Sequence, residues 1–157
     1  MNRFFDIPYI VSRELMPWES ARRGLDTKTG LFELMAQEPR IRLRSDIAGG
    51  VLELEAGQIS DLASIPSIVQ WACVDCDDQR IAGGAWFHDD LYKKGGRVPI
   101  YDIDGTFIKI VYLTRQQCDQ ILCDEAMPDL GASKLDRIKV YSGLRIGGHF
   151  SFKPSTI

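Results

Sequence analysis

The amino-acid sequence predicts an α+β fold, in which a small N-terminal antiparallel sheet is followed by three to four packed helices. Two observations favour this class. Apolar and polar residues alternate in the period of a half-buried strand before residue 60, and helix-capping signals recur after it. The chain has 157 residues, 45% of them hydrophobic, which is enough for one core. We therefore expect a single domain over residues 1–157, with mainly strands and loops over 1–60, mainly helices over 61–148 and a C-terminal tail over 149–157.

The expected strands lie in the first third of the chain. Three segments alternate between apolar and polar residues, namely residues 31–35, 41–44 and 51–55. Gly49 and Gly50 mark a turn between the last two of them. Residues 8–13 form a further short apolar segment, whereas residues 18–30 are charged and loop-like, with room for a short helix over 19–23. This pattern predicts a small sheet or a set of hairpins.

The expected helices follow residue 61. Their signals delimit four segments, which cover residues 66–73, 79–93, 114–127 and 133–146. Thr114 and Gln117 form a capping box at the start of the third helix, and Pro128 is expected to end it. Residues 98–110 are rich in turn-forming residues, so they predict a loop with at most a short strand over 107–111.

The sequence His88-Asp89-Asp90-Leu91-Tyr92 holds one of only two histidines. In a helix, His88 and Tyr92 share a face, and Asp89 points to an adjacent one. A base, a carboxylate and a phenol on one turn suit a general-base or metal site. The alternative is that His88 and Tyr92 are buried polar residues whose hydrogen bonds are satisfied locally.

Two further carboxylates are candidates to join this box. Asp119 lies on the helix predicted over 114–127, where it could accept the imidazole N–H and fix its tautomer, or merely complement the helix dipole. Asp61 could bind a metal ion or orient His88. Asp61 and Ser64 could instead cap the helix that begins near Pro66. Ser64 lacks the glycine-flanked elbow that exposes a catalytic serine, so we favour a capping role for it.

The sequence does not decide whether this site binds a metal ion, and the candidate divalent cations are calcium and zinc. The cysteines occur as two pairs, Cys73 with Cys76 and Cys118 with Cys123. Such pairs can bind zinc, but positions five apart in a helix diverge, so we expect reduced and partly buried thiols. The acidic segments 75–78 and 102–104 lack the spacing of an EF-hand, which favours solvated loop acids over a calcium site.

Charge and hydropathy exclude some classes of protein. The formal net charge is −3, without the basic surface typical of nucleic-acid binding. No apolar run approaches the roughly 20 residues that span a bilayer. The N-terminal residues contain no long apolar segment of the kind found in signal peptides. We therefore expect synthesis in the cytoplasm, no membrane span and no nucleic-acid partner.

Three motifs occur in a fixed order along the chain. They are Asp61-Leu62-Ala63-Ser64-Ile65-Pro66, then His88-Asp89-Asp90-Leu91-Tyr92, then Asp119 with Glu125-Ala126-Met127. In this order the chain resembles the small bacterial and bacteriophage family catalogued as domain of unknown function 1353, over roughly residues 41–146. It differs from the family pattern at Ser60, Cys118 and Leu122, none of which is a predicted site residue. The resemblance implies a phage or prophage origin and implies no particular reaction.

A second similarity is to secreted phospholipases that cleave the middle acyl chain of a phospholipid. Those enzymes carry H-D-x-x-Y on one helix and supply an aspartate from an antiparallel helix. The similarity implies that His88 is a general base, Asp89 a calcium ligand, and Tyr92 and Asp119 supports for the histidine. The glycine-rich calcium loop and the disulfides of those enzymes are absent, so only the local pattern is shared.

Two functions follow as hypotheses. The first is a virion-associated tail or baseplate component or an assembly factor, made in the host cytoplasm, whose partners are other phage structural proteins or further copies of itself. Phe150 and Phe152 suit that role, since they alternate on an expected terminal strand that could join a neighbouring sheet. The second is a metal-assisted hydrolase of envelope lipid or peptidoglycan that uses His88 as its base. In both, Trp71 and Trp86 are expected to anchor the core.

Overall fold

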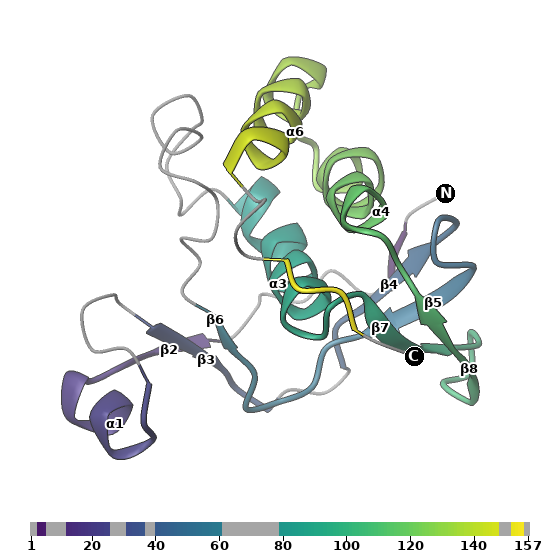
Figure 1. Ribbon diagram of the computed structural model, residues 1–157. Coiled ribbons are helices and arrows are strands. Elements are labelled where there is room, and N and C mark those ends of the chain that lie inside the picture. Colours follow the sequence, from purple (N-terminus) through teal and green to yellow (C-terminus); the bar gives the residue numbers. More distant parts are fainter. Residues whose placement is uncertain are drawn as a thin grey trace.

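The computed structural model describes residues 3–5, 12–25, 31–36, 40–60, 79–147 and 152–155. Its strands are β1 (Phe4–Phe5), β2 (Ser12–Leu15), β3 (Leu31–Leu34), β4 (Arg42–Ser45), β5 (Gly50–Glu53), β6 (Ile59–Ser60), β7 (Arg97–Tyr101) and β8 (Phe107–Tyr112). Its helices are α1 (Pro17–Arg22), α3 (Gln79–Lys93), α4 (Arg115–Gln120), the π-helical segment η1 (Ile121–Ala126), α5 (Met127–Asp129) and α6 (Lys134–Gly147). Two antiparallel sheets and a group of helices confirm the α+β class (Figure 1).

The larger sheet has five antiparallel strands in the order β1-β4-β5-β7-β8. Leu43 of β4 pairs with Leu52 of β5, and both are buried. They join Ile100 of β7 and two α3 residues, Trp86 and Leu91, in the main core cluster. Trp86 therefore anchors the core, as predicted. Burial of this apolar surface fixes α3 against the sheet, and Figure 1 shows α3, α4 and α6 grouped together.

The smaller sheet has three strands in the order β2-β3-β6, and α1 follows β2 (Figure 1). The short helix expected over 19–23 is present as α1, held by charged contacts. Arg13 bonds to Glu19 at 2.9 Å and to Glu33 at 2.7 Å, and Arg23 bonds to Glu33 at 2.9 Å. Strand β6 ends at Ser60, a fully buried residue that reaches the candidate site described below.

The short strand expected over 107–111 is present as β8, but the loop predicted before it was wrong, because β7 forms there and pairs with β8 in a hairpin. Pro99 lies inside β7 although it has no N–H to donate. The N–H of Leu113 donates to the Gly96 carbonyl at 2.9 Å, and bonding directions alternate along a strand. The missing N–H of Pro99 is therefore directed away from β8, and no bond of the hairpin is lost. Residues 61–148 are thus not purely helical, since this hairpin separates α3 from α4.

The turn of this hairpin is closed by an acidic side chain. Asp102 Oδ1 accepts the N–H groups of Asp104 at 2.9 Å and Thr106 at 2.8 Å. Gly105 has a φ of +87°, a conformation that glycine adopts without strain. The side chain of Asp102 therefore organises the turn through its own backbone, which is a common role for aspartate.

The helix after Thr114 begins as predicted and ends later than predicted. Thr114 Oγ1 accepts the Gln117 N–H at 3.3 Å, and Gln117 Oε1 accepts the Thr114 N–H at 2.9 Å. The helix does not stop before Pro128 but passes through η1 into α5. Arg137 Nη1 donates to the Cys123 carbonyl at 3.4 Å. That carbonyl is the acceptor that a π-type N–H at position 128 would have used, so Arg137 replaces the donor that proline lacks.

The other helix predictions have mixed outcomes. The helix expected over 79–93 is α3 with the same bounds, and the one expected over 133–146 is α6, shifted by one residue. The helix expected over 66–73, together with Trp71, lies outside the described residues. Within the part of the chain that the structure describes, no helix is both long and apolar enough to cross a membrane.

The expected terminal strand does not form at Phe152. Residues 152–155 have no regular secondary structure, and Phe150 lies outside the described residues. The Phe152 ring packs edge-on against Tyr92, with ring centroids 5.2 Å apart. The Ser155 N–H donates to the Gly95 carbonyl at 2.9 Å. This segment therefore packs against its own chain, beside the end of α3.

Candidate functional site

His88 and Tyr92 lie one turn apart on the buried face of α3. Their ring centroids are 4.1 Å apart with an angle of 38° between the planes. His88 is 3% exposed, so both faces of its ring are almost completely covered. The four-residue spacing therefore has the consequence predicted from the sequence, because it places both polar rings on one side of the helix.

Asp119 is the point at which three donors meet. His88 Nε2 lies 3.0 Å from Asp119 Oδ1, and the Tyr92 hydroxyl donates to the same oxygen at 2.5 Å. Arg145 of α6 donates to Oδ2 at 3.2 Å. Asp119 itself is 0% exposed. We call these four residues the central cluster. It joins α3, α4 and α6 through one carboxylate.

The close approach of α3 to η1 lets these side chains meet. A Cβ atom on Gly84 would lie 2.6 Å from Leu122 Cδ1 and 3.0 Å from the Ala126 Cβ. Such distances are shorter than side chains tolerate, so glycine at position 84 permits the observed helix packing. His88 lies one turn after Gly84 on α3, and Asp119 lies one turn before Leu122. Glycine at this position therefore allows α3 and η1 to pack closely, one turn away from the imidazole and the carboxylate.

The electrostatics of the cluster favour one protonation pattern. Burial raises the pKa of Asp119, but hydrogen bonds from His88 and Tyr92, the charge of His88 and the Arg145 bond together lower it below its ordinary value. Burial, then the hydrogen bond to Asp119 and its charge, raises the pKa of Tyr92 far above its ordinary value. Asp119 is thus an ionised acceptor and Tyr92 a neutral donor. A neutral His88 then carries its proton on Nε2 and its lone pair on Nδ1.

Asp89, the candidate metal ligand, points to a different neighbour. It is buried, and its Oδ2 accepts a hydrogen bond from the hydroxyl of Ser60 at the end of β6. Asp61, the second candidate ligand, lies outside the described residues, as does Ser64. Among the described residues, no group of three or more His, Cys, Asp or Glu side chains is arranged to hold a metal ion. The described residues thus supply Asp89 as a candidate metal ligand but not the further ligands that would complete a metal site.

The cysteine pairs do not support a zinc site within the described region. Cys118 and Cys123 are both buried. Burial, followed by the charge of Asp119, raises the pKa of the Cys118 thiol to about 12. A thiol held neutral in this way is a poor zinc ligand, since zinc binds thiolate. Cys73 and Cys76 lie outside the described residues.

A third buried carboxylate, besides those of Asp119 and Asp89, was not identified as a site residue from the sequence. Glu125, in η1, accepts hydrogen bonds from four groups: Ser45 Oγ at 2.5 Å, Asp46 N at 2.9 Å, Arg3 Nη1 at 3.1 Å and Ile47 N at 3.2 Å. We call these five residues the turn anchor, because they tie the helix to the turn between β4 and β5. The available signal was weak, because Asp124 and Glu125 are adjacent between the buried Cys123 and Ala126, and only the structure shows that Glu125 is the buried one, which requires hydrogen-bond partners.

Arg145 was also missed by the sequence analysis. It lies near the end of α6, where a basic residue commonly faces the helix dipole. Because the helix dipole already accounts for a basic residue at this position, the sequence gives no reason to expect its bond to Asp119, which lies 26 positions earlier in the chain. Nothing in the local pattern distinguishes it from the other arginines.

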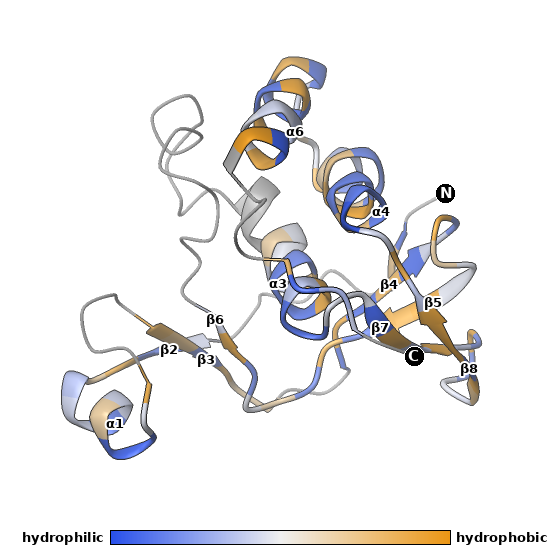
Figure 2. Ribbon diagram, viewed as in Figure 1, coloured by the Kyte–Doolittle hydropathy of each residue, from blue (hydrophilic) through white to orange (hydrophobic). Residues whose placement is uncertain are grey.

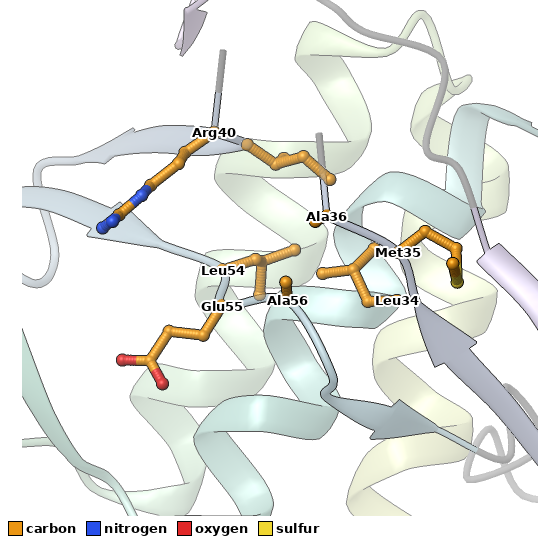
Figure 3. A pocket seen from close by; sticks show the side chains of 8 residues that line it. Leu34, Met35, Ala36, Arg40, Leu54, Glu55 and Ala56 are labelled. Carbon is orange, nitrogen blue, oxygen red and sulfur yellow. The ribbon is translucent and has the colours of Figure 1, made fainter. Parts of the chain in front are cut away.

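A separate cavity lies away from the central cluster. Its volume is about 320 Å³, and it lies beside the ends of β3 and β5. The lining residues are Leu34, Met35, Ala36, Arg40, Ile41, Leu54, Glu55 and Ala56. Figure 3 shows Leu34 and Leu54 pointing toward one another, with the charged ends of Arg40 and Glu55 extending to one side. No residue of the central cluster lines it, so the cavity supplies no access to His88.

Comparison with known proteins assigns the chain to a family. The model of the family described as "Protein of unknown function (DUF1353)" matches residues 37–144, which is more than half of the chain. No curated protein and no solved structure matches it. The matched region contains α3, α4 and η1, and thus His88, Tyr92, Asp119 and Glu125. The chain belongs to the DUF1353 family.

Proposed function

We propose that this protein is a phage-encoded assembly component, of the kind found in a tail or baseplate, made in the host cytoplasm and carried into the virion. One observation carries the proposal: strand β8, at the edge of the larger sheet, exposes a row of large hydrophobic side chains. Four of its residues are between 40% and 55% exposed, namely Phe107, Ile108, Ile110 and Tyr112. Monomeric proteins rarely leave such a row on an open strand edge. Its partners are then other structural proteins or further copies of itself.

The buried clusters support this proposal, because each can be explained as bracing. In the central cluster, both oxygens of Asp119 are occupied by groups of the same chain. In the turn anchor, Glu125 is held by four donors. Polar networks of this kind fix one arrangement of helices and strands in a core. A rigid core that presents an apolar edge suits a subunit that must fit its neighbours.

Mass spectrometry of purified virions tests the proposal directly. We expect the protein in particles at a fixed ratio to the major tail proteins. We also expect that deletion of its gene gives particles that electron microscopy shows to be defective or incomplete. Particles that lack the protein, together with normal assembly after deletion, would refute the assembly role.

A hydrolase of envelope lipid or peptidoglycan is the second candidate. It is favoured by the 3.0 Å contact of His88 Nε2 with Asp119, an arrangement in which a carboxylate orients a histidine base. Asp89, on the next position of α3, would hold a divalent cation, and calcium suits a carboxylate ligand better than zinc. In this mechanism His88 would accept the proton of a water molecule, and a cation held by Asp89 would supply electrostatic stabilisation of negative charge.

The hydrolase candidate requires an activity test with a folded variant. Purified protein is incubated with labelled phospholipid vesicles and with peptidoglycan, with calcium, with zinc and with chelator. We expect His88→Gln to lower any hydrolysis by at least about 100-fold, since a positioned base contributes about that much. Thermal unfolding of the same variant checks that the fold persists. Hydrolysis that survives His88→Gln, or none on either substrate, would reject this candidate.

A further inference from the structure

The C-terminal segment formed by residues 152–155 lies against the end of α3. The Phe152 ring packs edge-on against Tyr92 at a centroid distance of 5.2 Å, and the Ser155 N–H donates to the Gly95 carbonyl at 2.9 Å. Figure 1 shows the segment in yellow, where it passes along α3. We call residues 152–155 the tail segment. It contacts the central cluster directly, because Tyr92 is a member of that cluster.

A chain of aromatic contacts links the tail segment to His88. Phe152 contacts Tyr92, and the Tyr92 ring centroid lies 4.1 Å from that of His88. The Tyr92 hydroxyl and His88 Nε2 both bond to Oδ1 of Asp119, so any movement of Tyr92 alters the surroundings of the imidazole. Tyr92 is 7% exposed and His88 is 3% exposed. The cluster is therefore closed to solvent while Phe152 is in place.

Gly95 allows the tail segment to approach α3 closely. A Cβ atom at this position would overlap the Lys153 carbonyl oxygen and would lie 2.7 Å from the Ser155 nitrogen. Both are backbone atoms, so no side-chain rotation would relieve the overlap. Gly95 also has a φ of +57°, which favours glycine just after a helix ends. The same residue thus ends the helix and makes room for the tail segment.

The tail segment is held more weakly than the helices around the central cluster. It has no regular secondary structure, and Lys153 and Pro154 are exposed. Figure 2 shows the segment as mostly hydrophilic, and its apolar contact with the core comes from the partly buried Phe152. The three helices, by contrast, are joined through Asp119. Segments with few buried contacts open at a lower free energy than the core, so the tail segment is expected to open first.

We propose that the tail segment is a displaceable cover, which closes the central cluster and whose release from Gly95 and Tyr92 admits water and substrate to His88. The proposal rests on the hydrolase candidate only for the chemistry that would follow opening. Release breaks the Ser155 hydrogen bond and separates two aromatic rings, and it needs no covalent change. The bond between His88 and Asp119 joins α3 to α4, so it persists in the open form.

Hydrogen exchange of the purified full chain tests whether the tail segment opens by itself. The Ser155 and Leu113 amides each donate a 2.9 Å bond to one of two adjacent glycines, Gly95 and Gly96. The buried Leu113 is therefore a matched reference. After correction for intrinsic rates, we expect the Ser155 amide to exchange at least about tenfold faster, because local release breaks only its bond. Equal protection of the two amides would overturn the cover, since the segment would then open only with the fold.

Chemical labelling tests whether this opening reaches His88. Diethyl pyrocarbonate acylates accessible neutral imidazole, and peptide mass spectrometry separates His88 from His149, the other histidine. We expect Phe152→Ala to accelerate the labelling of His88 by about tenfold, because an aromatic pair that holds the closed form is lost. Phe107→Ala is the matched control, since it removes an edge-on pair with Tyr101 on β8, at a centroid distance of 6.2 Å. We expect the wild-type labelling rate in this control.

The variant Gly95→Ala displaces the tail segment from its other end. The added Cβ meets the backbone of Lys153 and Ser155 and leaves the Phe152 side chain unchanged. Gly131→Ala is the control for backbone strain, since Gly131 has a φ of +84° and its added Cβ has open space around it among the described residues. We expect faster labelling of His88 in Gly95→Ala and the wild-type rate in Gly131→Ala.

Thermal unfolding of the four variants establishes that each retains the fold at the labelling temperature. Labelling is repeated at several low concentrations of urea. Release of a short segment exposes little surface, so we expect a labelling rate that changes little with urea. A rate that rises as steeply as global unfolding would overturn the cover. So would equal rates for His88 in Phe152→Ala, Gly95→Ala and their controls.

Failure of the cover is distinct from failure of the hydrolase, because labelling and hydrogen exchange need no substrate. Faster labelling of His88 in both variants, without hydrolysis of any envelope substrate, would retain the cover and reject the hydrolase. Hydrolysis by the wild-type protein, with unchanged labelling in Phe152→Ala and Gly95→Ala, would retain the hydrolase and reject the cover.

Discussion

Asp119 is the residue on which the central cluster depends. Its carboxylate receives donors from α3 and α6, so it is the common partner of groups that are otherwise separate. It is buried and carries a charge that Arg145 balances. Because Arg145 is 37% exposed, solvent screens this ion pair, and the cost of losing Asp119 comes mainly from its contacts with the buried His88 and Tyr92, at about 1.5–3 kcal/mol for a hydrogen bond to a charged group. Substitution of Asp119 is therefore expected to destabilise the central cluster more than substitution of any other member.

The pH dependence of stability should reveal this carboxylate. The pKa of Asp119 in the folded protein is below its ordinary value, despite the opposing effect of burial, because of bonds from His88, Tyr92 and Arg145. Its stabilisation is therefore complete above the unfolded-state pKa and is lost as the pH falls through the folded-state pKa. We expect Asp119→Asn to lower the free energy of unfolding by about 3 kcal/mol near neutral pH, and by progressively less below about pH 4.

Urea denaturation of both proteins between acidic and neutral pH measures this difference. Asp124→Asn is the control, since Asp124 is 60% exposed and should change the unfolding free energy little at any pH. A wild-type to Asp119→Asn difference that stays constant down to strongly acidic pH would contradict the assignment.

At the scale of elements, the sequence predicted most helices well and one hairpin poorly. Gly95 and Gly96 predicted where α3 ends, and the Thr114–Gln117 capping box predicted where α4 begins, because these signals act locally. Strand β7 was missed because Pro99 normally interrupts a strand, and only its orientation in the hairpin removes that cost. The π-helical turn of η1 was also not predicted, and a carbonyl within it, that of Cys123, accepts a hydrogen bond from Arg137 of α6. In both places the observed contacts join elements that are distant in the sequence.

Gly84 offers a prediction about the packing of two elements. Alanine is the better helix former by about 1 kcal/mol, which would favour Gly84→Ala in isolation. Here its Cβ would meet Leu122 Cδ1 at 2.6 Å, so we expect a net loss of about 1–3 kcal/mol of stability. Thermal unfolding measures the loss. The double variant Gly84→Ala/Leu122→Ala should be less destabilised than the sum of the single changes, and strict additivity would contradict the contact.

At the scale of the whole molecule, the turn anchor joins the beginning of the chain to its helices. Glu125 accepts from Arg3 and from the turn between β4 and β5, and Asp129 accepts the N–H groups of Arg3 and Phe4, each at 2.9 Å. We expect Glu125→Ala to lower the free energy of unfolding by about 3 kcal/mol, since several charged hydrogen bonds are lost together. Asp124→Ala, one position earlier and exposed, should change it by less than about 0.5 kcal/mol.

Hydrogen exchange locates the effect of Glu125→Ala. The amides of Asp46 and Ile47, which donate to Glu125, should exchange faster in this variant than in Asp124→Ala. Unchanged exchange at both amides would show that the carboxylate does not hold the turn.

The candidate site was predictable only in part from the sequence. The local spacing of His88 and Tyr92 gave their shared face, and chemistry suggested an acidic partner such as Asp119. Sequence patterns carry little information about pairing across long separations, so Arg145 and Glu125 were not assigned. Arg145 near a helix end and Glu125 within a helix are both common residues for such positions, so only the folded structure reveals their contacts.

The central cluster has a consequence for how the chain is made. Its Asp119 carboxylate accepts a hydrogen bond from Arg145, and its Tyr92 ring packs against Phe152. Near the start of the chain, Arg3 bonds to Glu125. During synthesis Arg145 and Phe152 leave the ribosome after α3. The native packing around α3 is therefore complete only once these later residues have also emerged.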